Sequence, residues 1–282
     1  MAKTYKIDMT SGPILPKLLK LALPLMLSSV LQLLFNAADI VVVGNFASDQ
    51  SLAAVGSTSS LVNLMTNLFL GLSTGANILT SHYMGAKDSE KVEKTIHTSI
   101  LLSIISGAIL TVIGVLFADK LLLLMKTPED VLPLSTLYLR IYFAGMVAMM
   151  IYNFGSSILR SKGDTKRPLY FLTFAGVINV VLNLIFVIVL KMDVAGVALA
   201  TVISQCVSAF LIILCLIRET DEFHFDFKKL SLDVAITKKL LSIGVPAGFQ
   251  GVCFSLSNVV IQSSINSFGS IVMAGSAAAA SI

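Results

Sequence analysis

Long apolar runs constrain this chain more than any other feature of its sequence. A membrane-spanning helix needs about 20 predominantly apolar residues. Seven stretches meet this requirement, at 17–43, 52–80, 96–118, 131–159, 168–190, 195–217 and 244–268. An eighth begins near residue 271 and is cut off at Ile282. Only 13% of the residues are charged, against about 25% in globular domains. The sequence therefore predicts an all-α polytopic membrane protein.

Basic residues favour one side of the predicted membrane. All but four of the 20 Lys and Arg residues lie before or at the start of the first apolar segment or in every second connection. The exceptions are Lys120, Lys126 and Lys191 in the intervening connections and Arg140 inside the fourth segment, where we expect it to snorkel or to pair. Because positive charge collects on the cytoplasmic side, we expect a multi-pass protein of the plasma (inner) membrane with a cytoplasmic N-terminus.

A weak internal repeat indicates how the segments are organised. With a shift of 222 residues, "KLLKLALP" at 17–24 falls on "KLLSIGVP" at 239–246, and Asn36 falls on Asn258. Both copies begin on the cytoplasmic side, so the repeat is parallel. We expect a six-helix transmembrane lobe at 1–218, a cytoplasmic linker ending in an amphipathic helix at 219–243, and the incomplete start of a second lobe at 244–282.

Asp39 is the one acid that lies well inside an apolar segment, in "FNAADIVVVG" at 35–44. At 1.5 Å per residue it lies about 7 Å inside the outer boundary. An ionised carboxylate there must face a polar cavity, pair with a cation or hold a proton. Asn179, Asn183 and Thr201 fall at similar depths. These oxygens could bind Na⁺ or hydrogen-bond a protonated acid, although such residues often only join helices.

Polar residues in the first two segments indicate where a cavity could lie. Asn63, Asn67 and Thr74 fall near one face of the second segment, where they could line a wet cavity or join helices. Enzyme and nucleotide-binding motifs are absent, so we expect neither an enzyme nor a cofactor, and any transport would use an ion gradient. No basic stripe with interleaved aromatic residues predicts nucleic-acid binding.

Three stretches together resemble the MATE (multidrug and toxic compound extrusion) family, close to its DinF-like bacterial members. They are "LALPLMLSSVLQLLFNAADIVVVGNF", "LRSKGDTKRPLYF" and "GVALATVISQ". The resemblance implies two six-helix lobes, of which this chain would hold the first and the start of the second. It also implies a full-length monomer that exports cationic or amphiphilic drugs through the bilayer in exchange for H⁺ or Na⁺.

The resemblance assigns roles to particular residues. Asp39 matches the family's helix-one coupling acid, and Asn179 and Thr201 match its cation site. Position 183 holds Asn183, where many members have Asp, which leaves the coupling ion open between H⁺ and Na⁺. Asn36 is a candidate cavity residue, and Pro24 is the candidate hinge, since proline removes a backbone donor and can kink a helix. The alternatives are a lipid-linked precursor flippase and a membrane scaffold that transports nothing.

Overall fold

Helices cover almost all of residues 14–279, the part of the chain that the computed structural model describes, and no strand occurs there. The all-α fold is therefore confirmed. Lys3 and Lys6, and the end of the predicted eighth segment beyond Ala279, lie outside the described residues. The helices are α1 (Ile14–Phe46), α2 (Asp49–Gly85), α3 (Ser89–Leu124), α4 (Leu132–Ala144), α5 (Met146–Ser161), α6 (Lys166–Asn183), the π-helix η1 (Leu184–Val189), α7 (Asp193–Ile217), the short 3₁₀ turn η2 (Phe227–Lys229), α8 (Val234–Asn266) and α9 (Ser270–Ala279).

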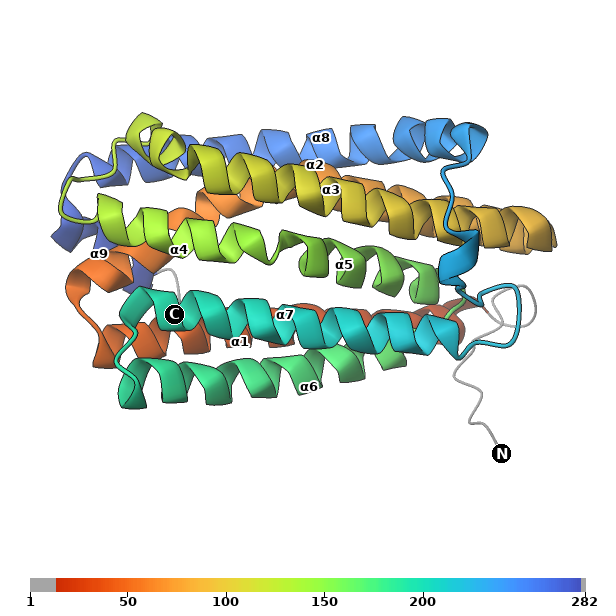
Figure 1. Ribbon diagram of the computed structural model, residues 1–282, viewed down its shortest axis with the longest axis horizontal. Helices are drawn as coiled ribbons and strands as arrows, with labels where there is room; N and C mark the ends of the chain where they lie inside the picture. The colour runs from red at the N-terminus through yellow and green to blue at the C-terminus, as the bar shows by residue number, and fades with distance from the viewer. Residues whose placement is uncertain (1–13, 280–282) are drawn as a thin grey trace.

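The long helices run side by side between two ends of the molecule (Figure 1). Within the described residues, 5 helices are long and apolar enough to cross a membrane, and there are 6 if α4 and α5, which are bent by 49° at their junction, count as one span. Helix α2 also runs the length of the bundle, but it is rich in Ser, Thr and Asn and packs against α8, α5 and α3.

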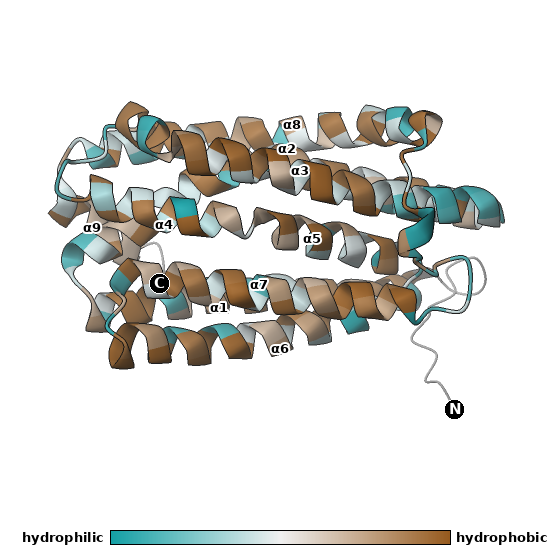
Figure 2. Ribbon diagram, viewed as in Figure 1, coloured by the Kyte–Doolittle hydropathy of each residue, from teal (hydrophilic) through white to brown (hydrophobic). Residues whose placement is uncertain are grey.

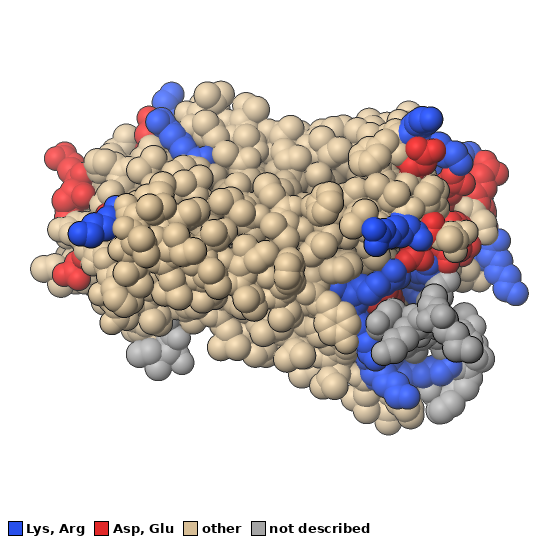
Figure 3. Space-filling model, turned by 60° about the horizontal axis from the view of Figure 1, so that its bottom comes forward, with Lys and Arg blue, Asp and Glu red and all other residues tan. Residues whose placement is uncertain are grey.

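Charge and hydropathy vary along the long axis of the helix bundle. The long helices are mostly apolar along their lengths (Figure 2), and the charged side chains on the face in Figure 3 gather at the two ends, with an uncharged belt between them. Such a belt suits the hydrocarbon layer of a bilayer. The described residues thus have the architecture of a multi-pass membrane protein.

The predicted fourth span, 131–159, is two helices rather than one. Helix α4 ends at Ala144 and α5 begins at Met146, with Gly145 between them. Gly145 N–H donates to the Tyr142 carbonyl, 3.1 Å away and three residues back, so the regular four-residue ladder is interrupted here.

The predicted linker also differs from the structure. Helix α8 begins at Val234, capped by the Asp233 side chain, and continues without a break to Asn266. The helix predicted at the end of the linker is therefore continuous with the apolar segment that follows it, and both belong to α8. Phe223 and Phe225 are fully buried in the main core, so the linker packs into the lobe that precedes it.

Candidate functional site

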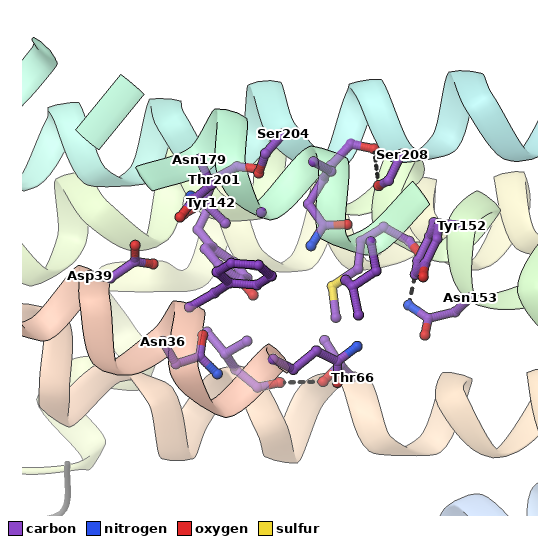
Figure 4. Close-up of a pocket in the computed structure, with 18 of the residues that line it drawn as sticks. Asn36, Asp39, Thr66, Tyr142, Tyr152, Asn153, Asn179, Thr201, Ser204 and Ser208 are labelled. Atoms are coloured by element: carbon purple, nitrogen blue, oxygen red, sulfur yellow. Dashed lines mark hydrogen bonds between the residues drawn. The ribbon is translucent and has the colours of Figure 1, made fainter. Parts of the chain in front are cut away.

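A polar cavity of about 270 Å³ lies among the helices from α1 to α7 (Figure 4). Its walls come from α1, α2, α4, α5, α6 and α7, so it forms only when segments distant in sequence pack together. The polar residues that line it are Gln32, Asn36, Asp39, Asn63, Thr66, Tyr142, Tyr152, Asn153, Asn179, Thr201, Ser204, Gln205 and Ser208. The apolar lining residues include Phe35, Met149 and Leu172.

The structure brings together the four residues predicted to bind the coupling ion. Asn183 Nδ2 donates to Asp39 Oδ1 and also to Asn179 Oδ1, 3.3 Å away. Asn179 Nδ2 donates to Thr201 Oγ1 over 3.3 Å, and the Thr201 hydroxyl donates to the Val197 carbonyl over 3.0 Å. One hydrogen-bonded chain therefore joins α1, α6 and α7.

Local helix geometry explains why these side chains meet. Asn179 and Asn183 are four residues apart on α6, so both face the same neighbour. Directly after Asn183 the helix widens into η1, a π-helical turn of the kind often found at functional sites. Thr201 lies two turns into α7, which returns through the bundle beside α6.

The carboxylate of Asp39 has no compensating positive charge among the described residues. It is 9% exposed, it is the only charged residue lining the cavity, and no Lys, Arg or His within residues 14–279 forms an ion pair with it. The Asn183 Oδ1 atom beside it is buried without a hydrogen-bond partner. Buried acceptors of this kind usually have partners, so Asn183 keeps one unused acceptor in addition to its hydrogen bond to Asp39.

The predicted cavity residues divide into two groups. Asn36 and Asn63 line the cavity. Asn67 does not, because its Nδ2 donates to Ser255 Oγ of α8 over 2.6 Å and so joins two helices. Thr74 is exposed outside the cavity. Of the three predicted α2 residues, only Asn63 therefore lines the cavity.

Two other predicted positions have structural partners. Pro24 is buried in α1, which continues through it as one helix, and Ser28 Oγ donates to the Pro24 carbonyl over 2.8 Å. The hinge role of Pro24 stays a prediction. Arg140 pairs with Asp119 at 3.9 Å, and both side chains are about half exposed, in line with the expected pairing.

Several lining residues were not predicted from the sequence, although helical spacing could have found them. Gln32, Asn36 and Asp39 on α1 recur at four and three residues, and Thr201, Ser204 and Ser208 on α7 recur at three and four. Both patterns mark one face of a helix. Tyr142, Tyr152 and Asn153 belong to the bent span, whose break decides what each face meets.

Comparison with known proteins supports the sequence resemblance. The family model described as MatE matches residues 24–185, more than half of the chain. The chain belongs to the MatE family.

Relatives of this MatE chain include a protein named "Probable multidrug resistance protein YpnP" from Bacillus subtilis, 33% identical over 272 residues, or 95% of this chain and 60% of the relative. Another is a protein named "FAD transporter" from Shewanella oneidensis, 27% identical over 89% of this chain and 56% of the relative. The chain thus spans little more than half the length of these relatives.

A solved structure gives the same picture of the MatE fold. It is the inward-facing conformation of a multidrug resistance MATE family transporter of the MOP superfamily. It superposes with a TM-score of 0.80 at 26% identity, covering 93% of this chain and 60% of that chain. The arrangement of helices around the cavity is therefore that of MATE transporters.

Proposed function

We propose that this chain forms the coupling lobe of a secondary multidrug efflux antiporter. The full-length protein would export organic cations or amphiphiles in exchange for H⁺ or Na⁺. The observation that carries the proposal is Asp39, an uncompensated carboxylate in a cavity whose other lining residues are uncharged. An unpaired acid inside a membrane span is costly, and such acids mark ion pathways.

Coupling arises because one carboxylate serves two competing cations. With Asp39 ionised, the cavity attracts the positive charge of a drug molecule. Uptake of H⁺ or Na⁺ from outside neutralises the same carboxylate and removes that attraction. The drug is then released, and the helices around the site change their packing.

The residues around Asp39 fit either coupling ion. A proton on Asp39 could be donated to the unpaired Asn183 Oδ1. Na⁺, a hard cation, prefers oxygen ligands, and Asp39, Asn183 and Thr201 could supply them. Asn183 adds no second negative charge, so a single monovalent cation neutralises the site.

The rest of the cavity supports a range of amphiphilic drugs as substrates. Phe35, Met149 and Leu172 offer apolar contact, while Asn153, Gln205 and Ser208 offer hydrogen bonds. Methionine adapts to ligands of different shapes. No Lys or Arg lines the cavity, which argues against the flippase alternative and against anionic dinucleotides such as the substrate in the name of the FAD transporter.

The proposed setting is the plasma (inner) membrane, with a monomer surrounded by lipid. The end of the bundle that holds the starts of α3, α6 and α8 would face the cytoplasm, because most of the basic residues lie there. Asp39, near the far end of α1, would then lie close to the outer side.

Dye efflux from vesicles containing the full-length protein tests the proposal. A proton gradient and a sodium gradient are imposed separately, with ethidium as the substrate. We expect one gradient to drive efflux, and we expect Asp39→Asn to abolish efflux while the protein still inserts. Asp119→Asn, at the half-exposed pair with Arg140, is the matched control and should keep efflux. Efflux by Asp39→Asn at the wild-type rate would refute the mechanism.

A further inference from the structure

The break at Gly145 lies against one face of α3. Gly107, Thr111 and Gly114 are spaced by four and three residues, which places them on that face. A Cβ on Gly107 would collide with the backbone of Val147, and a Cβ on Gly114 would collide with the ring of Phe143. The absence of a side chain at these two glycines therefore leaves space for Val147 and Phe143, which lie on either side of the break.

Thr111 makes the specific polar contact at the break. Its hydroxyl donates to the Phe143 carbonyl of α4 over 2.7 Å. Most other threonines in the described helices donate to a carbonyl of their own helix, as Thr66 and Thr173 do. The Phe143 carbonyl lies at the C-terminal end of α4, where the Gly145 N–H is directed at it and at the Tyr142 carbonyl, so the Thr111 hydroxyl adds a partner from a neighbouring helix at the break.

The break is next to the cavity. Tyr142 precedes it and Met149 follows it by one turn, and both line the cavity that Asp39 lines. Gly145 itself lines a small adjoining pocket with Tyr142, Met149 and Thr201. On the opposite side, a Cβ on Gly145 would meet the side chain of Val202 on α7. Phe143 is fully buried, with its ring against Gly114.

We propose that Gly107, Thr111 and Gly114 form a socket that holds the break in the fourth span and thereby positions Tyr142 in the cavity. With Phe143 fixed against α3, the neighbouring Tyr142 is turned toward the site, where its ring stacks on Tyr138 at 5.9 Å. Thr111 is thus a positioning residue that acts through Tyr142. The effect on drug transport rests on the proposed function, whereas the positioning itself does not.

Labelling of an introduced cysteine tests the positioning without any transport. Tyr142→Cys is made in the full-length protein after its native cysteines, Cys206, Cys215 and Cys253 among them, are replaced by Ser, and a water-soluble methanethiosulfonate reagent is applied. Adding Thr111→Val removes the hydroxyl donor. We expect the labelling rate at position 142 to fall by up to about five-fold, because loss of one hydrogen bond shifts the equilibrium away from the cavity-facing arrangement.

Two controls make the result specific. Asn63 lines the same cavity but belongs to α2, which does not contain the break. The labelling rate of Asn63→Cys should therefore not change when Thr111→Val is added. Thr111→Ser keeps the donor and should restore the rate at position 142. An unchanged rate at position 142, or an equal change at position 63, would overturn the inference.

A second variant covers the case in which Thr111→Val does not fold. Gly145→Ala favours a continuous helix and meets Val202, so it should slow labelling at position 142 in the same way, and no change there would also overturn the inference. Ethidium efflux is measured in parallel. If the wild-type protein moves no ethidium, the proposed function fails, while the labelling rates still decide the positioning.

Discussion

At the scale of single residues, the site depends on one charge and the amides beside it. The meeting of Asp39, Asn179, Asn183 and Thr201 could be predicted because depth along a membrane helix follows from residue counting. The exclusion of Asn67 and Thr74 from the cavity could not be predicted, since residue counting does not say which neighbour a helix face meets. The unpaired Asn183 Oδ1 also required coordinates.

If the proposed efflux holds, replacement of Asn183 by Ala should reduce it by at least about ten-fold, because a hydrogen bond to a charged group contributes more than a neutral one. The change removes the donor to both Asp39 and Asn179. Efflux by full-length protein in vesicles is the measurement. Asn45→Ala is the matched control, because the Asn45 side chain is exposed and donates only to the Val41 carbonyl of its own helix. Equal efflux by the two variants would contradict a role for the Asn183 amide.

At the scale of helices, close backbone contact decides the packing of α2 against α8. Gly71 and Gly75 of α2 lie directly against the backbone of Gly244 and Gly248 of α8, with no room for a Cβ at Gly71. Small residues allow such approach in a membrane, where dispersion rather than water exclusion holds helices together. Glycines are frequent in the spans, but their frequency does not say which helices pack together. The sequence also did not predict the break at Gly145, because glycines of this kind occur throughout the spans.

We expect Gly71→Ala to destabilise the protein by about 1–3 kcal/mol, the usual result of overpacking. Elsewhere in a helix the same change stabilises by up to about 1 kcal/mol. Thermal unfolding in detergent compares it with Gly275→Ala on α9, where a Cβ would meet nothing within 4 Å. Overpacking at Gly71 would be contradicted if both variants shifted the unfolding temperature in the same direction.

At the scale of the whole molecule, an ionic network joins the α5–α6 turn to the end of α7 and to the linker. The Lys162 side chain is 2% exposed and pairs with Glu219 and with Asp221. Arg167 pairs with Asp164 and Glu219. Burial raises the pKa of Glu219, but the hydrogen bonds from Lys162 and Arg167 outweigh it and hold that pKa below its ordinary value.

This network should make the stability of the fold depend on pH. A carboxyl with a lowered folded-state pKa stabilises the fold above its unfolded pKa of about 4.3, and the stabilisation is lost as the pH falls through the folded pKa. Glu219→Gln should therefore unfold at a lower temperature than wild type at pH 7, and the gap should narrow below about pH 4. Glu90→Gln, at an exposed pair with Lys94, should show little gap at either pH. A gap for Glu219→Gln that does not change with pH would contradict the network's role.

The buried linker has a consequence for anyone who divides this protein into parts. Counting spans predicts that the first lobe ends at residue 218. Phe223 and Phe225, which follow it, are nevertheless buried in the main hydrophobic core. The Asp226 N–H donates to His97 Nε2 over 3.1 Å, and Thr98 Oγ1 donates to the Ser231 carbonyl over 3.3 Å. A fragment that ends at residue 218 would lack these two buried side chains and leave a cavity in its core. A fragment that keeps these contacts must extend beyond residue 231.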